Sequence, residues 1–431
     1  MKKTKIAIAG LGCVGQGVIN ILQANKGVLE KRTNCHFDIV GVTARRKEIN
    51  RECDISPYQW FDTPQQLLEQ AKPDIFVEVI GGEAGIAKDS VEQAIKNKIN
   101  TVTANKALLS KHGNDLNKLA HEYGVDIGFE AAIAGGIPIV KAIREAAIAS
   151  QITSIHGILN GTCNFILSKM RTEKKDFLNV LNEAQQLGYA EADPTFDIDG
   201  IDAAHKISLL SALAFGCEIS FESVSCEGIR NIHLSDIEHA EELGYRIKLL
   251  AIAEQFENGE ITQSVEPVMV PMCNPLAAVE DVFNAVEYGD VFNDNIILQG
   301  RGAGAGPTAT SVVADICDIA CGHGRPLLNI PANDVKEHVN VKGENRKAAY
   351  YFRLEVLDIP GVLADISTIF RDIGLSISSL IQHGESAGMP VSVIITTHMF
   401  SICHLPILLE KINALSYIQK PTTAIRIGDF E

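Results

Sequence analysis

The stretch Lys5–Gly15, which reads KIAIAGLGCVG, sets the architecture of the first part of the chain. A short apolar run over Lys5–Ala9 is followed at once by the spacing Gly-x-Gly-x-x-Gly, and helical periodicity continues over Val18–Leu29. A strand, such a glycine loop and a helix in this order form a dinucleotide-binding unit, with the pyrophosphate at the helix N-terminus. We therefore expect cofactor contacts from Gly10, Gly12, Cys13, Val14 and Gly15.

Apolar strand-like runs alternate with helix-like segments after this unit. The runs cover Asp38–Thr43, Asp74–Ile80, Asn100–Thr103 and Val125–Phe129, and the helix-like segments cover residues 64–70, 88–97 and 114–123. This alternation predicts an α/β fold with a doubly wound, Rossmann-type parallel sheet.

Lys106 directly follows one of these strands, in the sequence TANK at residues 103–106. Ligands of doubly wound sheets gather beyond the carboxyl ends of the strands. Lys106 is therefore expected at the cofactor crevice, where it would hold an oxygen of the substrate or of the nicotinamide side. The alternative is a surface lysine at the start of a helix, because lysines are usually exposed.

The second strand ends in the basic sequence Ala44-Arg45-Arg46-Lys47. An acid normally stands at this point and binds the ribose 2′-hydroxyl of NAD, whereas basic side chains suit a 2′-phosphate. The sequence therefore favours NADP(H) over NAD(H), with Arg45 and Arg46 as contacts. An exposed basic loop without a ligand is the alternative.

The stretch Leu187–Lys206, LGYAEADPTFDIDGIDAAHK, holds five carboxylates and ends in a lysine. Asp202 and Lys206 share one face if a helix begins near residues 199–200, and the residues after Lys206 are apolar enough to bury it. A partly desolvated lysine beside a carboxylate suits proton transfer. The alternatives are an acidic loop with one surface ion pair, and a calcium loop, which is set aside because its glycine is not at position 6 and Ser208 stands at position 12 in place of Glu.

Two further loops are rich in glycine. Gly300–Pro307 opens a predicted helix over Thr308–Cys321 that is expected to return to the nucleotide domain. The other loop follows Glu130 and offers free carbonyls beside one carboxylate, an environment that hard cations favour. From the residues alone, a plain turn into a helix over Val140–Ala149 is the better interpretation.

The C-terminal part begins after a polar segment over Lys336–Lys347, interpreted as a linker. The predicted elements beyond it follow the order βαββαβ over about 80 residues, which is that of a ferredoxin-like module. Turn amides at Pro360-Gly361, with the helix N-terminus behind them, could bind a small carboxylate.

Composition narrows the functional classes. With 431 residues, two or three domains are expected, and the net charge of −16 argues against a nucleic-acid-binding surface. No signal peptide and no transmembrane stretch are predicted. Ten cysteines without a CxxC pair favour free thiols in a reducing cytoplasm over disulfides or zinc.

One long motif resembles the signature of a known family. The residues Ala184-x3-Gly188-Tyr189-Ala190-x2-Asp193-Pro194-x2-Asp197-Ile198-x-Gly200-x-Asp202-x3-Lys206 are similar to the signature of homoserine dehydrogenases. TANK at 103–106, NGTCNFIL at 160–167 and the glycine loop at 300–310 support the resemblance, which extends over the whole chain. The C-terminal module looks like an ACT regulatory domain, so the chain resembles the monofunctional form.

The resemblance implies three domains and an activity. The domains would be a nucleotide-binding domain over residues 1–135 with about 305–335, a substrate-binding and dimerisation domain over 136–304, and an ACT domain over 348–431. The activity would be the reversible, NADP(H)-dependent reduction of L-aspartate 4-semialdehyde to L-homoserine, in threonine, methionine and isoleucine biosynthesis. Feedback by L-threonine and a homodimer or homotetramer would accompany it.

The resemblance also implies roles for single residues. Lys206 would be the acid/base group, Asp202 would position the substrate, and Glu191 would bind its ammonium group. Lys106 would contact substrate and cofactor, while Gly188 and Gly302 would contact the cofactor. A sodium ion would be held by Glu130 and the backbone of Ile133, Gly135 and Ile137.

Two other functions stay open at this point. A semialdehyde dehydrogenase that forms an acyl intermediate would need an activated cysteine, and Cys163 has no evident base nearby in the sequence. A non-catalytic sensor that binds a nucleotide and an amino acid is the other possibility, although it would have no obvious use for the Asp202/Lys206 pair.

Overall fold

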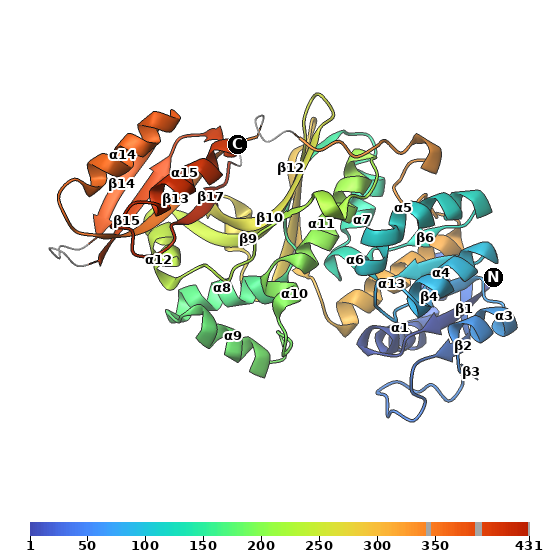
Figure 1. Cartoon of the computed structure of the whole chain (residues 1–431). Helices are drawn as coiled ribbons and strands as arrows, with labels where there is room; N and C mark the ends of the chain where they lie inside the picture. Colours follow the sequence, from blue (N-terminus) through green and yellow to red (C-terminus); the bar gives the residue numbers. More distant parts are fainter. Residues whose placement is uncertain (342–345, 384–389, 430–431) are drawn as a thin grey trace.

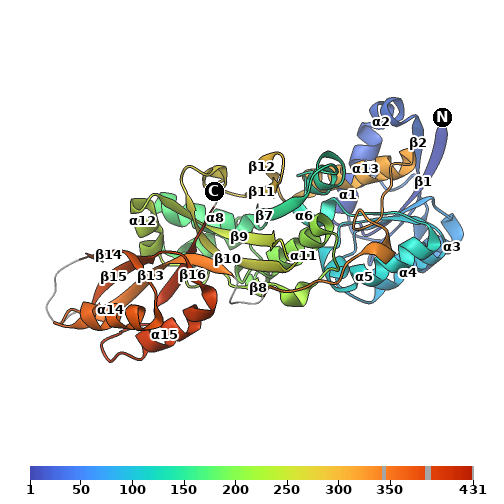
Figure 2. The same ribbon diagram turned by 90° about the horizontal axis from the view of Figure 1, so that it is seen from above.

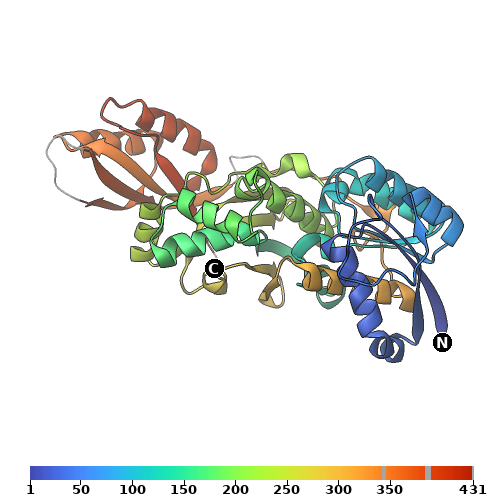
Figure 3. The ribbon, with the colours of Figure 1, turned by 90° about the horizontal axis from the view of Figure 1, so that it is seen from below.

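The computed structural model describes residues 1–341, 346–383 and 390–429 of the chain (Figure 1). The N-terminal sheet and the C-terminal module lie at opposite ends of the molecule, with a second sheet between them (Figures 1 and 2). The view from below shows the same elongated arrangement (Figure 3).

The first sheet has six parallel strands in the order β3-β2-β1-β4-β5-β6. The strands are β1 Lys2–Ala9, β2 Cys35–Thr43, β3 Trp60–Phe61, β4 Ile75–Glu78, β5 Asn100–Thr103 and β6 Ile127–Gly128. The helices that accompany them are α1 Cys13–Ala24, α2 Lys26–Thr33, α3 Pro64–Ala71, α4 Ile86–Lys96 and α5 Lys106–Tyr123. The doubly wound Rossmann-type sheet predicted from the alternation is confirmed.

Three local details differ from the prediction. The first helix ends at Ala24 instead of continuing to Leu29, and a separate helix α2 begins after Asn25. Helix α5 begins at Lys106, eight residues before the predicted start at Asn114, because the side chain of Asn105 caps it by accepting the amide of Leu108. Strand β3 was not predicted, since two residues carry no periodicity.

Helix α13, Ala305–Cys321, packs against α1 although some 280 residues separate them. Val18 and Ile19 of α1 share a buried apolar cluster with Val312 and Ile316 of α13. The last long helix before the C-terminal module thereby becomes part of the core beside β1.

The second sheet has eleven strands, most of them in the order β12-β11-β7-β9-β10-β17-β13-β15-β14. Its central part consists of β7 Ile152–Ile158, β9 Tyr245–Gln255, β10 Ile261–Pro271, β11 Phe283–Asp290 and β12 Asp294–Arg301. The helices of this region are α8 Gly161–Glu173, α9 Phe177–Gln186, α11 Ile201–Phe215 and α12 Leu234–Glu242. Helix α11 is buried at nearly every position and packs on β7, β9 and β10.

The C-terminal module has the predicted βαββαβ order. Its elements are β13 Lys347–Leu357, α14 Val362–Ile373, β14 Ile377–His383, β15 Pro390–Thr397, α15 Leu405–Asn413 and β17 Thr423–Ile427. The antiparallel strand order β17-β13-β15-β14 is that of a ferredoxin-like sheet. Strand β17 also pairs in parallel with β10, so the module continues the second sheet.

The segment interpreted as a linker lies against the second sheet. Residues 342–345 of that segment fall outside the described residues. Before them, the amide of Val341 donates to Ile261 of β10, and the amide of Ile261 donates to Val339. Arg346 donates to Ser264 and Glu266 of β10. The described part of this linker is therefore not free in solution, because hydrogen bonds to β10 hold it.

The helix predicted over Val140–Ala149 is shorter and irregular. A short α7, Ile139–Lys141, passes directly into a π-helical turn over Ala142–Ala146. The carboxylate of Glu130 accepts the amides of Val140 and Lys141, which fixes where the turn starts. None of the helices in the described ranges is long and apolar enough to cross a membrane.

Candidate active site

A cavity of about 580 Å³ lies between the loops of the first sheet and helix α11. Val14, Ala104 and Lys106 line it from the nucleotide side. Asp202 and Lys206 line it from α11, on the other side. Gly188, Gly302 and Ile133 complete the predicted residues that the fold brings to this cavity.

The glycine loop has the geometry that a bound pyrophosphate needs. Gly10 has a φ of +102°, and a Cβ there would lie 2.3 Å from the carbonyl oxygen of Val79. A Cβ on Gly15 would lie 2.0 Å from the carbonyl oxygen of Gly10, whereas a Cβ on Gly12 would meet nothing within 4 Å. Two glycines thus permit close backbone packing, and Gly12 faces open space at the start of α1, where no side chain caps the free amides.

The basic loop after β2 is exposed and does not line this cavity. Arg51 donates to the carbonyls of Lys47 and Ile49 and lies 5.4 Å from the ring of Trp60, which orders the loop. Arg45 and Arg46 are exposed, and no ion pair of either guanidinium occurs within the described residues. Both side chains are therefore free to contact a ligand at the end of β2.

Lys206, Asp202 and Lys106 form one contiguous cluster. The Lys206 ammonium donates to Asp202 at 2.8 Å and to the carbonyl of Leu159 at 2.7 Å. Lys106 lies 3.1 Å from the other oxygen of Asp202. Asp202 and Lys206 are 5% and 8% exposed, so the predicted burial of Lys206 is confirmed.

The charges of this cluster shift one another. Burial lowers the pKa of Lys206, the Asp202 carboxylate opposes that shift, and the Lys106 ammonium adds to it; the net direction is downward. Burial alone would raise the pKa of Asp202, but Lys206 and Lys106 together lower it below the usual range. The result is an aspartate fixed as an anion beside a lysine that releases its proton more readily than a free one.

Sequence reasoning missed the residue that holds the cluster together. The Asn160 side-chain amide donates to Asp197 at 2.8 Å and to Asp202 at 3.0 Å. Its side-chain oxygen accepts the amide of Cys163 and so caps α8. The signal was present in NGTCNFIL, where an Asn stands before a helix, but a bridge between two aspartates of a distant stretch is visible only in the fold.

Glu191 is not part of the cavity wall. It is exposed, and its backbone carbonyl accepts a hydrogen bond from Gln185. Tyr189, two residues earlier, does line the cavity, and its ring lies 4.9 Å from that of Phe165. The loop that carries Glu191 therefore borders the cavity, although its carboxylate does not reach it here.

Glu130 is buried at the start of the irregular turn. Burial, together with the nearby Asp315 carboxylate, raises the pKa of Glu130 to about 7. Each of its oxygens accepts one backbone amide and keeps a further lone pair. The Gly135 carbonyl accepts the hydroxyl of Ser311 at 2.6 Å. This buried carboxylate has open lone pairs, and the nearby Arg144 only partly offsets its charge, an environment that a hard cation would suit.

Cys163 does not have the surroundings of a nucleophile. The side chain is fully buried, and its thiol donates to the carbonyl of Asp197. Burial, with smaller contributions from Asp197 and Asp202, raises the pKa of the thiol well above its usual value. A thiol that stays protonated cannot form an acyl intermediate.

The fold and the cavity define an NAD(P)-dependent oxidoreductase, since a dinucleotide-binding sheet opens onto a buried lysine that can carry a proton. Two family models match the chain, "Homoserine dehydrogenase, NAD binding domain" over residues 10–130 and "Homoserine dehydrogenase" over residues 138–317. The chain belongs to the homoserine dehydrogenase family, whose reaction takes place at a CH–OH group. The possibility of a non-catalytic sensor is thereby excluded.

Two of three individual relatives cover nearly the whole chain, and the third covers three quarters of it. A homoserine dehydrogenase from Neisseria gonorrhoeae is 42% identical over 434 residues, with 99% of each chain covered. The crystal structure of a homoserine dehydrogenase from Thiobacillus denitrificans superposes with a TM-score of 0.92 at 39% identity, covering 100% of this chain and 99% of that one. A hyperthermophilic archaeal homoserine dehydrogenase in complex with NADPH has a TM-score of 0.65 at 30% identity and covers 75% of this chain and 99% of its own.

Proposed function

We propose that this homoserine dehydrogenase interconverts L-aspartate 4-semialdehyde and L-homoserine, with Lys206 as the group that moves the proton. The observation that carries the proposal is the buried Lys206 ammonium in the cavity wall, 2.8 Å from an aspartate. The bound nicotinamide supplies or accepts the hydride. The protein then needs to orient the substrate and to move one proton at its oxygen.

Each residue of the cluster has a part in this scheme. In the reducing direction Lys206 donates its proton to the aldehyde oxygen, and in the oxidising direction it takes the proton from the hydroxyl of homoserine. Asp202 holds both lysines and positions the substrate, and Lys106 contacts substrate and cofactor from the nucleotide side. Glu191 would bind the substrate ammonium, which requires its side chain to turn into the cavity that Tyr189 lines.

Oxidation of NADPH in the presence of L-aspartate 4-semialdehyde tests the substrate assignment directly. Loss of absorbance at the nicotinamide band is expected with the semialdehyde and not with aldehydes that lack the amino-acid end. A semialdehyde dehydrogenase would instead require phosphate or coenzyme A and a reactive thiol, and the buried Cys163 offers none.

NADPH is proposed as the preferred cofactor. The free guanidiniums of Arg45 and Arg46 follow β2 at the point where a ribose would lie, and the archaeal relative is described with NADPH. Gly10, Gly12, Cys13, Val14, Gly15, Gly188 and Gly302 are the other proposed cofactor contacts. Comparison of kcat/KM for NADPH and NADH measures the preference.

A sodium ion is proposed at Glu130, with the carbonyls of Ile133, Gly135 and Ile137 as further ligands. Bound there, the cation would neutralise a buried carboxylate and hold in place the chain segment that connects the first sheet to the second. Sodium chloride should raise the melting temperature more than choline chloride at the same ionic strength, and Glu130→Gln should abolish the difference. An equal effect of both salts on the melting temperature of the wild type would contradict the proposed sodium site.

The C-terminal module is proposed to be an ACT domain that binds L-threonine. A pocket of about 410 Å³ is lined by the loop Asp358–Gly361, the start of α14, and residues of β14 and β15. Gly361 precedes α14 without a side-chain cap, so amides are free for a carboxylate, and Asp358 could accept an ammonium group.

Threonine titration of the activity tests this regulation. Asp358→Ala should weaken inhibition, whereas Asp372→Ala, at the exposed far end of α14, should not. Inhibition that is unchanged in Asp358→Ala would place the effector elsewhere. Truncation at residue 346 is a poor test, because it would remove Arg353 from Asp236 and Arg426 from Glu254.

A homodimer or homotetramer is also proposed. Val291 and Phe292 are adjacent at the tip between β11 and β12 and are 60% and 79% exposed, so they offer apolar surface to a second copy of the chain. Light scattering should give a multiple of the chain mass of 46.6 kDa. A monomer at micromolar concentration would contradict the assembly.

A further inference from the structure

Three cysteines gather at the amino-terminal edge of the first sheet, on the side away from the active-site cavity. Cys35 is the first residue of β2, and Cys321 is the last residue of α13. Cys317 lies one turn before Cys321 on the same helix. Cys35 is 3% exposed, Cys317 is half-buried and Cys321 is exposed, and all three are free thiols.

The thiols of Cys35 and Cys321 face each other between β2 and α13. The Cys35 sulfur lies 3.7 Å from the carbonyl oxygen of Ala320, the residue before Cys321. The Cys321 sulfur lies 3.8 Å from the carbonyl oxygen of Thr33, two residues before Cys35. Partial burial raises the pKa of the Cys321 thiol, and the neighbouring Cys35 thiol raises it further. Proximity of this kind is the requirement for a disulfide.

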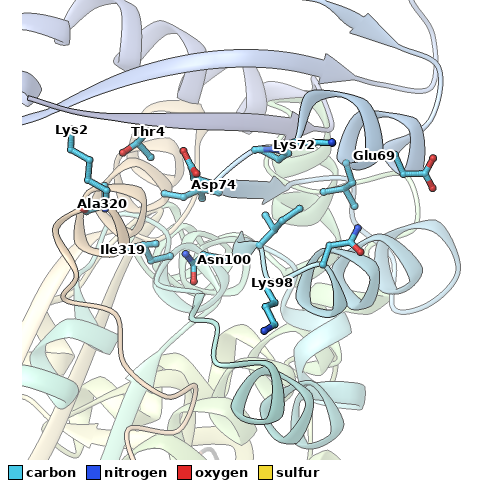
Figure 4. Close-up of a pocket in the computed structure, with 14 residues that line it drawn as sticks. Lys2, Thr4, Glu69, Lys72, Asp74, Lys98, Asn100, Ile319 and Ala320 are labelled. Carbon is cyan, nitrogen blue, oxygen red and sulfur yellow. Dashed lines mark hydrogen bonds between the residues drawn. The ribbon is translucent and has the colours of Figure 1, made fainter.

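Solvent reaches this edge of the sheet through a pocket of about 590 Å³ (Figure 4). Lys2 crosses from β1 to donate to the carbonyl of Ala320 at 3.0 Å, and both residues line the pocket. The hydroxyl of Thr4 in the same pocket is buried and has no partner among the described atoms, so we expect water to enter there. Neither cysteine of the pair lines this pocket; hydrogen peroxide reaches Cys321 directly, because that side chain is exposed.

A metal ion is a poor explanation for the three thiols. Within the described part of the chain, no group of three cysteine, histidine or acidic side chains is placed to hold a metal. Burial raises the pKa of Cys317 to about 12, so this thiol stays protonated. The chemistry that remains is that of the two facing thiols.

We propose that Cys35 and Cys321 are an oxidant-sensitive pair that a hydroperoxide converts into an intramolecular disulfide. The exposed Cys321 sulfur, as thiolate, attacks one oxygen of the peroxide, giving a sulfenic acid and hydroxide. The Cys35 sulfur then attacks the sulfenic sulfur, the S–S bond forms, and the sulfenic hydroxyl leaves as water. In total two thiols and one hydrogen peroxide give one disulfide and two water molecules.

The bond would join the end of α13 to the start of β2. The opposite end of α13 begins at Ala305, beside the cavity residues Gly304 and Thr308. A disulfide at the far end leaves the cavity unchanged, but it constrains the unfolded chain. The oxidised protein should therefore melt about 5 °C higher than the reduced protein.

Peptide mapping of the intact enzyme tests the pair. Reduced protein is treated with hydrogen peroxide at about pH 8.5, since the raised pKa of Cys321 slows the reaction at neutral pH. After removal of peroxide and alkylation, a cross-linked peptide containing Cys35 and Cys321 is expected, and dithiothreitol should release it. Cys317→Ser is the matched control on the same helix and should give the same peptide, whereas Cys321→Ser should give none.

The melting temperature gives a second readout, which does not depend on activity. Oxidation should raise it in the wild type and in Cys317→Ser, and leave it unchanged in Cys321→Ser, where an exposed side chain is replaced at little risk to folding. Two outcomes would contradict the proposed disulfide. One is that Cys321 is over-oxidised while Cys35 can still be alkylated. The other is that oxidation raises the melting temperature of Cys321→Ser as much as that of the wild type.

Discussion

Two buried clusters each have an aspartate at their centre, one beside the nucleotide-binding domain and one beside the C-terminal module. Asp202 lies in the cavity wall with two lysines, and the Lys106 side chain keeps 31% of its surface exposed. Asp236 lies between α12 and β13 and is fully buried. It accepts two nitrogens of Arg353, at 2.6 and 3.2 Å, and the Tyr351 hydroxyl. The first cluster faces space for a ligand, and the second faces only protein.

The cationic residues match this difference. A lysine can lose its proton when burial lowers its pKa, so it can serve as an acid and a base. An arginine stays charged and binds a carboxylate through a rigid fork, which suits a permanent joint. Buried ion pairs of similar appearance thus serve catalysis in one region and attachment of the C-terminal module in the other.

Replacement of Lys206 should have the largest effect on catalysis. Lys206→Ala should lower kcat about 10³-fold, the usual contribution of a positioned acid/base group. Lys111→Ala, which removes an exposed lysine of α5, is the control and should keep normal activity. A Lys206→Ala enzyme with normal kcat would contradict the catalytic role of the Asp202 cluster, because both clusters would then be structural.

Replacement of Arg353 should act on stability instead. Arg353→Met leaves Asp236 buried with half of its partners, which should cost about 3 kcal/mol in the free energy of unfolding while kcat stays near normal. Chemical denaturation measures the loss. Arg371→Met, which breaks an exposed pair with Asp372, should cost less than about 0.5 kcal/mol. Equal losses of stability in the two variants would show that the contact between Asp236 and Arg353 stabilises the fold no more than an exposed ion pair does.

The pH dependence should shift in opposite directions when the two neighbours of Lys206 are changed. Asp202 raises the pKa of Lys206 and Lys106 lowers it. In Asp202→Asn the alkaline limb of the reduction should move to lower pH, and in Lys106→Gln it should move to higher pH, because reduction needs the protonated lysine. Measuring the residual kcat of each variant as a function of pH gives both shifts. Movement in the same direction would contradict the assignment of Lys206.

The same lowered pKa has a consequence for stability. Between the lowered folded pKa and the higher unfolded pKa of Lys206, the unfolded chain binds more protons. The free energy of unfolding contributed by this residue should therefore rise with pH across that window. Lys206→Met should flatten the alkaline part of a stability-against-pH curve, measured by denaturation at several pH values; an unchanged slope would argue against a depressed pKa.

Replacement of Arg45 and Arg46 should have the smallest effect. Both side chains are exposed and do not line the cavity that holds Lys206, so Arg45→Ala with Arg46→Ala should raise KM for NADPH about tenfold without changing kcat. KM for NADH should hardly change. A parallel rise for both cofactors would indicate a general role of the loop rather than recognition of a 2′-phosphate.

Local patterns were sufficient where an element carries its own signals. Strand β5 has the predicted bounds, and so do α14, β15 and β17, for which the sequence predicts Val362–Ile373, Pro390–Thr397 and Thr423–Ile427, since alternation or flanking glycines mark them. The ends of α1 and α5 were misplaced, because Asn25 and Asn105 act through backbone geometry and a cap that periodicity does not show. The parallel pairing of β17 with β10 joins residues about 160 positions apart and has no local signal.

The sequence by itself determined the nucleotide fold, the acidic stretch and the lysine one turn beyond Asp202, because each rests on spacing within a few residues. Only the tertiary structure decided that Lys106, Asn160 and Leu159 meet at that lysine, that Glu191 stands outside the cavity, and that the C-terminal module is built into the central sheet. Spacing fixes which side chains share a face of one element. The packing of distant elements fixes which charges lose their water and find a partner, and that sets the chemistry of the site.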